Sequence, residues 1–269
     1  MRYSISCLRR LLILGGTAEA AALARATLER FGDRVSVTSA LAGRTDEPAP
    51  LPGMVRIGGF GGPEGLASYL EREAVDLLID ATHPFAEQIS RHARLAAERT
   101  SVPRLMLDRP AWKRHPLDRW IEVETMAGAA MAVARLGRRC LMTAGTRGIE
   151  AFSGNSGVHF VVRLIDAPKA ALPLPSYELL LARGPFLLVE ERALLKQHRI
   201  DIMVAKASGG GATEAKLIAA REAEMPVVLL RRPRPEPGPR VENVPAALEW
   251  IGARLGGSTT ERGKEALHP

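Results

Sequence analysis

The sequence predicts an α/β protein with two similar Rossmann-like domains, each built on a parallel sheet. Short runs of leucine and β-branched residues alternate with alanine-rich stretches of helical periodicity, which is typical of parallel strands joined by crossover helices. One set of motifs also occurs twice in the same order. This repetition indicates an internal duplication of one α/β unit.

The repeated set has three motifs. The first copy comprises residues 11–17, 75–82 and 102–110, and the second comprises residues 140–146, 200–208 and 225–233. The offsets are 129 residues between Thr17 and Thr146, 126 between Thr82 and Ser208, and 123 between Pro110 and Pro233. An offset that changes so little along the chain favours duplication over chance.

The first copy gives a regular series of elements. The expected strands are 11–14, 34–39, 75–79 and 104–107, and the expected helices are 18–30, 64–73 and 86–99. Gly32 ends the first helix, and the glycine-rich run 58–62 is a connection between elements.

The second copy repeats this plan. Its expected strands are 140–143, 158–164, 200–204 and 227–230. In both copies an Arg-Pro pair is followed by a long loop, a short acidic strand and a helix; these are residues 121–124 and 126–136, then 241–244 and 245–255. Because the loops are long, each strand could stay in its own half or cross to the other, so the sequence leaves an exchange of strands open.

These elements predict the domain limits. We expect an N-terminal nucleotide-binding domain at residues 1–112, a C-terminal substrate domain at 113–257 and a flexible tail at 258–269. If the strands are exchanged, residues 240–257 join the N-terminal domain.

Composition limits the classes of partner. The chain of 269 residues is 46% hydrophobic, so it can fill the cores of two domains. It carries a net charge of +7 but is only 4% aromatic, which argues against a nucleic-acid partner because few rings are available to stack on bases. A positive balance suits a ligand with several carboxylates.

The two cysteines, Cys7 and Cys140, lie far apart and form no metal-binding motif, so we expect neither a disulfide nor a metal site. A cytoplasmic location fits this pattern. No stretch approaches the roughly 20 apolar residues that span a bilayer, so we expect no membrane segment.

The turn after the first strand is a candidate dinucleotide site. Gly15, Gly16 and Thr17 lie where a doubly wound fold offers backbone N–H groups and a helix N-terminus to a phosphate. The run differs from G-x-G-x-x-G, and Glu19 places a negative charge close to any pyrophosphate. A plain tight turn is the alternative.

Two further strand ends extend this site. The second strand is followed by no acidic residue, so Ser39 and Arg44 are candidate ligands of the 2′-phosphate that distinguishes NADP from NAD. After the third strand, Thr82 could cap the next helix, and His83 beside Phe85 could contact the nicotinamide.

The second half carries three loops that could bind anions at neighbouring strand ends. The candidate ligands of substrate carboxylates are Gly145, Thr146, Arg147, Arg183, Lys206, Ser208, Gly209 and Gly210. Consecutive glycines expose N–H groups, and the cations supply charge. Tyr177, Glu178 and Asp201 are possible proton handlers, but their spacing selects none of them, so no catalytic residue is assigned.

Together these motifs resemble those of the precorrin-6A reductase family of cobalamin biosynthesis, including its cobalt-precorrin-6A members. The resemblance spans about residues 10 to 255 and rests on residues 14–20, 42–44, 80–86, 182–186 and 206–210. It implies NADPH-dependent hydride transfer to a polycarboxylated tetrapyrrole, with the cofactor held mainly by the N-terminal half. Ala207 stands where the family often has an acidic residue.

Hydride transfer needs alignment and exclusion of water more than acid or base groups, which agrees with the lack of an evident nucleophile. The sequence leaves open whether the substrate contains cobalt and whether the chain is a monomer. A non-catalytic NADP(H)-binding sensor is the alternative from a different class.

Overall fold

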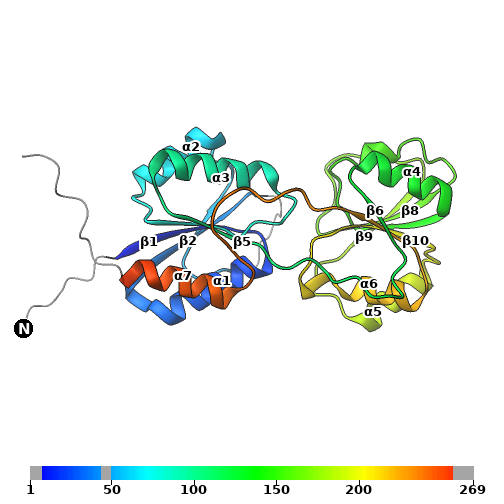
Figure 1. Cartoon of the computed structure of the whole chain (residues 1–269). Helices are drawn as coiled ribbons and strands as arrows, with labels where there is room; N and C mark the ends of the chain where they lie inside the picture. The colour runs from blue at the N-terminus through cyan, green and yellow to red at the C-terminus, as the bar shows by residue number, and fades with distance from the viewer. Residues whose placement is uncertain (1–7, 44–49, 257–269) are drawn as a thin grey trace, which may run out of the picture. The chain divides into compact units, whose positions relative to one another are not determined.

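The computed structural model describes residues 8–43 and 50–256, which form two compact units. Among these residues, the first unit contains 8–43, 50–109 and 235–256, and the second contains 110–234. The chain therefore passes from the first unit to the second and back again (Figure 1). Each unit has a six-stranded parallel sheet, which confirms the predicted α/β class with two similar domains. The predicted tail at 258–269 lies outside the described residues.

The first unit has the strand order β12-β5-β4-β1-β2-β3. Its strands are β1 (Arg9–Leu14), β2 (Val35–Leu41), β3 (Met54–Ile57), β4 (Leu77–Asp80), β5 (Arg104–Leu107) and β12 (Arg240–Val241). Its helices are α1 (Ala18–Phe31), α2 (Gly62–Arg72), α3 (Glu87–Thr100) and α7 (Val244–Gly256). This order matches the dinucleotide-binding fold, in which the strand order reverses between the first strand and the fourth, here β1 and β4.

Both faces of the first sheet are covered by helices (Figure 1). Leu11 and Ile13 of β1 pack in the core beneath α1 and α7, whereas Leu12 and Leu14 pack beneath α2 and α3. Because successive side chains of a strand point to opposite faces, the unbroken apolar run of β1 fills both layers.

The second unit repeats this architecture with the strand order β6-β11-β10-β7-β8-β9. Its strands are β6 (Trp120–Val123), β7 (Arg139–Met142), β8 (His159–Leu164), β9 (Tyr177–Leu181), β10 (Ile202–Lys206) and β11 (Val227–Leu230). Its helices are α4 (Met126–Leu136) on one face and α5 (Leu188–Gln197) and α6 (Ala215–Glu222) on the other (Figure 1).

The edge strands next to β5 and β11 are exchanged. The strand that follows β5 in the chain is β6, and it pairs with β11 in the second sheet. The strand that follows β11 is β12, and it pairs with β5 in the first sheet. Of the two arrangements that the sequence left open, the structure has the exchanged one, and residues 240–256 lie in the first unit.

The strands at the opposite edges, β3 and β9, are absent from the sequence-based prediction. Their apolar side chains are largely exposed, as for Met54 (58%), Ile57 (61%) and Leu181 (55%). Strands of this kind lack the apolar run from which a buried strand is predicted. Within residues 8–43 and 50–256, the helices are all too short or too polar to cross a bilayer.

Candidate functional site

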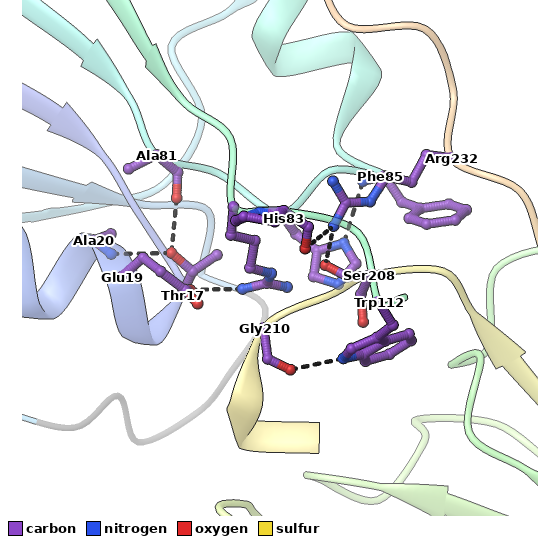
Figure 2. Close-up of polar contacts among 12 residues, drawn as sticks. Thr17, Glu19, Ala20, Ala81, His83, Phe85, Trp112, Ser208, Gly210 and Arg232 are labelled. Carbon is purple, nitrogen blue, oxygen red and sulfur yellow. Dashed lines mark hydrogen bonds and ion pairs between the residues drawn. The ribbon is translucent and has the colours of Figure 1, made fainter. Parts of the chain in front are cut away.

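The turn from β1 to α1 forms a preorganised corner at the carboxyl edge of the first sheet. The Thr17 hydroxyl accepts a hydrogen bond from the Ala20 amide (3.1 Å) and donates one to the Ala81 carbonyl (2.8 Å) (Figure 2). It therefore caps α1 and ties it to the segment after β4. Gly16 has φ +99°, and the space where a Cβ would point is open. A phosphate at the helix N-terminus fits this corner.

Glu19 does not stand alone beside this corner. The Arg109 guanidinium, which follows β5, makes an ion pair with Glu19 at 2.6 Å, and both side chains are largely buried. The pair offsets the negative charge that argued against a pyrophosphate here. The sequence did not predict the pair, because 90 residues separate its members.

The segment after β4 is held by Asp80, which is 1% exposed. Its carboxylate accepts hydrogen bonds from the amide of Thr82 (3.2 Å) and from its hydroxyl (2.7 Å). Thr82 therefore does not cap the following helix: α3 begins at Glu87, and its N-cap position is Ala86. The Thr82 hydroxyl instead lies 3.3 Å from the Ser90 hydroxyl, in the first turn of α3.

His83 lies in the same segment. Its Nδ1 accepts a hydrogen bond from the Phe85 amide (3.2 Å), and the two rings are 5.8 Å apart (Figure 2). This bond fixes the orientation of the imidazole at the carboxyl end of β4, next to the Thr17 contact with Ala81. The two strand ends meet where the strand order reverses, the usual place of a nucleotide in this fold.

The two residues predicted to bind a 2′-phosphate differ in what the structure shows of them. Ser39 lies within β2 and is only 3% exposed. Arg44 lies outside the described residues. Their role toward a phosphate stays a prediction.

The second unit presents its predicted anion-binding loops at the carboxyl edge of its own sheet. Gly145, Thr146 and Arg147 follow β7, and the last two are exposed. Arg183 follows β9 and is also exposed. Lys206 is the last residue of β10 and is partly exposed. The parallel sheet thus brings cations from three strand ends to one edge.

The glycine loop after β10 is anchored by aromatic and cationic side chains that the sequence analysis missed. Trp112 donates its indole N–H to the Gly210 carbonyl (2.8 Å), and Arg232 donates to the Ser208 carbonyl (2.7 Å) (Figure 2). A Cβ on Gly209 would overlap the Pro110 carbonyl and the Arg232 guanidinium. Ser208 and Gly209 are buried by these contacts, so both have a packing role whatever their role toward substrate.

The three possible proton handlers lie elsewhere. Tyr177 and Glu178 begin β9, and Asp201 immediately precedes β10, so all three lie at the amino edge of the second sheet. Asp201 accepts hydrogen bonds from the amides of Arg138 and Arg139 (3.0 Å). The hydrogen bond from His198 lowers the pKa of Glu178. These contacts stabilise the sheet, and the parallel strand direction separates the three residues from the loops.

The described part of the chain contains no cluster of three or more His, Cys, Asp or Glu side chains arranged to hold a metal. A cluster of another kind is present in the second unit: Arg163, Glu191 and Lys216 are charged and are 7%, 1% and 6% exposed. The alanine-rich and leucine-rich helix patterns gave no sign of it, because the three residues come from β8, α5 and α6.

The family described as Precorrin-6x reductase CbiJ/CobK matches residues 10–252. A protein of Rhodococcus erythropolis named Precorrin-6A reductase is 47% identical over 244 residues, which cover 90% of this chain and 97% of that protein. A Cobalt-precorrin-6A reductase of Priestia megaterium is 30% identical over 238 residues, covering 85% and 92%.

A solved structure titled CobK precorrin-6A reductase superposes with a TM-score of 0.86 at 38% sequence identity, covering 92% of this chain and 97% of that one. The match extends through both units. The chain belongs to the precorrin-6x reductase CbiJ/CobK family.

Proposed function

We propose that this protein reduces precorrin-6A to precorrin-6B in the cytoplasm, with NADPH as the reductant. The observation that carries the proposal is the chemistry at the carboxyl edges of the two sheets. The first edge has the N-terminus of α1 and a preorganised turn that fit a dinucleotide, and the second has cations that fit an acidic ligand. The 47% identity to a protein named Precorrin-6A reductase, against 30% to a Cobalt-precorrin-6A reductase, favours the cobalt-free substrate.

The residues of the first unit fit a dinucleotide. Gly15, Gly16 and Thr17 would hold the pyrophosphate at the start of α1, because the corner offers open space at Gly16 and the N-terminus of a helix. Thr82 and His83 would lie beside the nicotinamide. Bound NADPH supplies the hydride, and the protein aligns the reactants and keeps water away.

The residues of the second unit would orient the macrocycle. Arg147, Arg183 and Lys206 would bind its acetate and propionate groups by charge-assisted hydrogen bonds. The N–H groups of Gly145, Thr146, Gly209 and Gly210 are further candidates, and so is the hydroxyl of Ser208, whose amide donates to the Lys206 carbonyl. Exposed cations at one edge also raise the local concentration of an anionic ligand.

The test of the reaction is to incubate the protein with precorrin-6A and NADPH and to follow the nicotinamide and macrocycle absorbance bands together. We expect the two bands to change in step. A protein that binds NADPH but leaves both bands unchanged would contradict the proposal and favour a nucleotide sensor. Cobalt-precorrin-6A as the competing substrate decides between the two macrocycles.

The choice of NADPH over NADH is tested by titrating both nucleotides against the wild type and Arg44→Ala. We expect the wild type to prefer NADPH, and the substitution to reduce that preference by about tenfold or more, as for the loss of a hydrogen bond to a charged group. Equal affinity for both nucleotides in both proteins would rule out the 2′-phosphate assignment.

A further inference from the structure

The buried charges of the second unit, Arg163, Glu191 and Lys216, lie close to the loops predicted to bind substrate. Arg163 on β8 makes an ion pair with Glu191 on α5. The Lys216 ammonium, at the start of α6, donates a hydrogen bond to the Thr143 hydroxyl (3.1 Å). Thr143 directly follows β7 and in turn donates to the Val204 carbonyl (3.0 Å) on β10. Lys216 therefore reaches the carboxyl edge where β7 and β10 end.

Each predicted substrate loop is linked to this group of side chains, either directly or through one residue. Thr143 leads directly into the loop that contains Gly145 and Arg147. The ring centre of Phe186, in the turn that begins at Arg183, lies 4.0 Å from the Arg163 guanidinium carbon. Trp112 donates a hydrogen bond to Gly210 of the glycine loop, and the centre of its ring lies 6.0 Å from the Lys216 nitrogen. All three loops thus share one charged support.

Packing alone does not explain a lysine at this place. An apolar side chain of similar size would fill the same space without the cost of removing a charge from water. That cost acts here: burial, followed by the positive charge of Arg163, lowers the pKa of Lys216 to about 7, and Glu191 opposes the shift. The amine therefore gains and loses its proton near neutral pH.

We propose that Lys216 is a positioning residue of the substrate site, which holds the loop after β7 through Thr143 and takes up a proton when a polycarboxylate binds. The inference rests on the proposed function. Bound carboxylates at the edge favour the charged amine, and by linkage the charged amine favours bound carboxylates. Substrate affinity should therefore fall as the pH rises above 7.

The test is calorimetric titration of precorrin-6A into the nucleotide-free protein at pH 7.5, in buffers of different ionisation enthalpy. We expect the wild type to take up roughly half a proton or more per substrate, and Lys216→Met to take up almost none. The wild-type affinity should also fall several-fold between pH 6 and pH 8.5, and that of Lys216→Met should stay level. Equal proton uptake in both proteins would overturn the proposal.

Lys196→Met is the matched control, since Lys196 is an exposed lysine of the same unit, on α5. It should keep the wild-type proton uptake. Loss of the uptake in this control as well would also overturn the assignment to Lys216.

Hydrogen exchange on the ligand-free proteins tests the positioning role without substrate. The amides of residues 144–148 should exchange faster in Lys216→Met and in Thr143→Val than in the wild type, and unchanged exchange in Thr143→Val would refute that role. If Lys216→Met fails to fold, Thr143→Val still tests the positioning role. If the wild type does not bind precorrin-6A at all, the proposed function fails, while the exchange result still decides the role of Lys216.

Discussion

Thr17 shows how one hydroxyl can serve both the fold and the site, because it caps α1 and bonds to the segment after β4. Thr17→Val keeps the shape of the side chain but removes both hydrogen bonds. We expect a loss of about 1–2 kcal/mol in the free energy of unfolding, together with weaker NADPH binding. Urea unfolding and a fluorescence titration with NADPH measure the two effects.

Thr125→Val is the control for this substitution. Thr125 caps α4 in the second unit by accepting a hydrogen bond from the Gly128 amide (3.1 Å). Its loss should lower stability by a similar amount and leave NADPH affinity unchanged. Equal losses of NADPH affinity in the two variants would show that Thr17 acts only through stability.

The ion pair between Arg109 and Glu19 also has a role that can be measured. In Arg109→Gln the carboxylate of Glu19 remains without this partner beside the predicted pyrophosphate, so NADPH should bind about tenfold more weakly. In Glu19→Gln/Arg109→Gln the repulsion is gone, and much of the affinity should return. A double variant as weak as Arg109→Gln would instead indicate that Arg109 binds the nucleotide directly.

The buried amine of Lys216 predicts a pH-dependent stability. Its pKa is lowered from 10.5 to about 7 in the folded protein, so between these values the unfolded chain binds more protons and the free energy of unfolding rises with pH. Below pH 7 the full cost of the buried charge remains. Lys216→Met should therefore exceed the wild type in stability by up to ~4 kcal/mol at pH 6, and the difference should shrink toward pH 10.

Urea unfolding of both proteins at pH 6, 8 and 9.5 measures this difference. A gap that stays constant over the three values would mean that the amine keeps an ordinary pKa. Lys216 would then be fully protonated at neutral pH and could take up no proton when the substrate binds.

At the scale of elements, the loop between β10 and α6 depends on a close approach of backbone segments. Gly209 has φ +61° and lies against Pro110 and Arg232. Gly209→Ala should therefore lower the free energy of unfolding by more than about 2 kcal/mol, as measured by thermal and urea unfolding. Gly211→Ala is the control: that glycine has open space around it, and its replacement should leave stability almost unchanged.

Sequence patterns located the buried strands better than the exposed ones. β1, β4, β10 and β11 are covered on both faces, so their unbroken apolar runs were visible without any structure. β3 and β9 pair with a neighbour on one side only, and their side chains are a mixture of exposed and half-buried groups. Their strand character comes from the ladder to β2 and β8, which is a non-local contact.

At the scale of the whole molecule, the exchange of β6 and β12 decides which core is completed by the helix after each of these strands. Ile251 of α7 is fully buried in the core of the first unit, and Val133 of α4 is fully buried in that of the second. Ile251→Ala should cost about 2–5 kcal/mol and should speed amide exchange in β1, β4 and β5. Val133→Ala should speed exchange in β7, β10 and β11 instead.

Hydrogen exchange followed by mass spectrometry separates these outcomes, because peptides from the two sheets do not overlap. If Ile251→Ala sped amide exchange in β10 and β11 while β1 and β5 stayed protected, α7 would pack against the second sheet and not the first. The structure excludes that order, since β12 pairs with β5.

The amino-acid sequence by itself determined the fold class, the duplication, the corner at Gly15–Thr17 and the family resemblance, because these depend on local periodicity and on short motifs. The tertiary structure decided which of the two strand arrangements is used, since both satisfy the same local pattern. It also decided that Glu19 pairs with Arg109 and Lys216 with Thr143. The same strand order and direction place Tyr177, Glu178 and Asp201 at the amino edge of the second sheet, away from the loops at its carboxyl edge. Such pairings depend on strand order and direction, which are set by contacts between residues far apart in the chain.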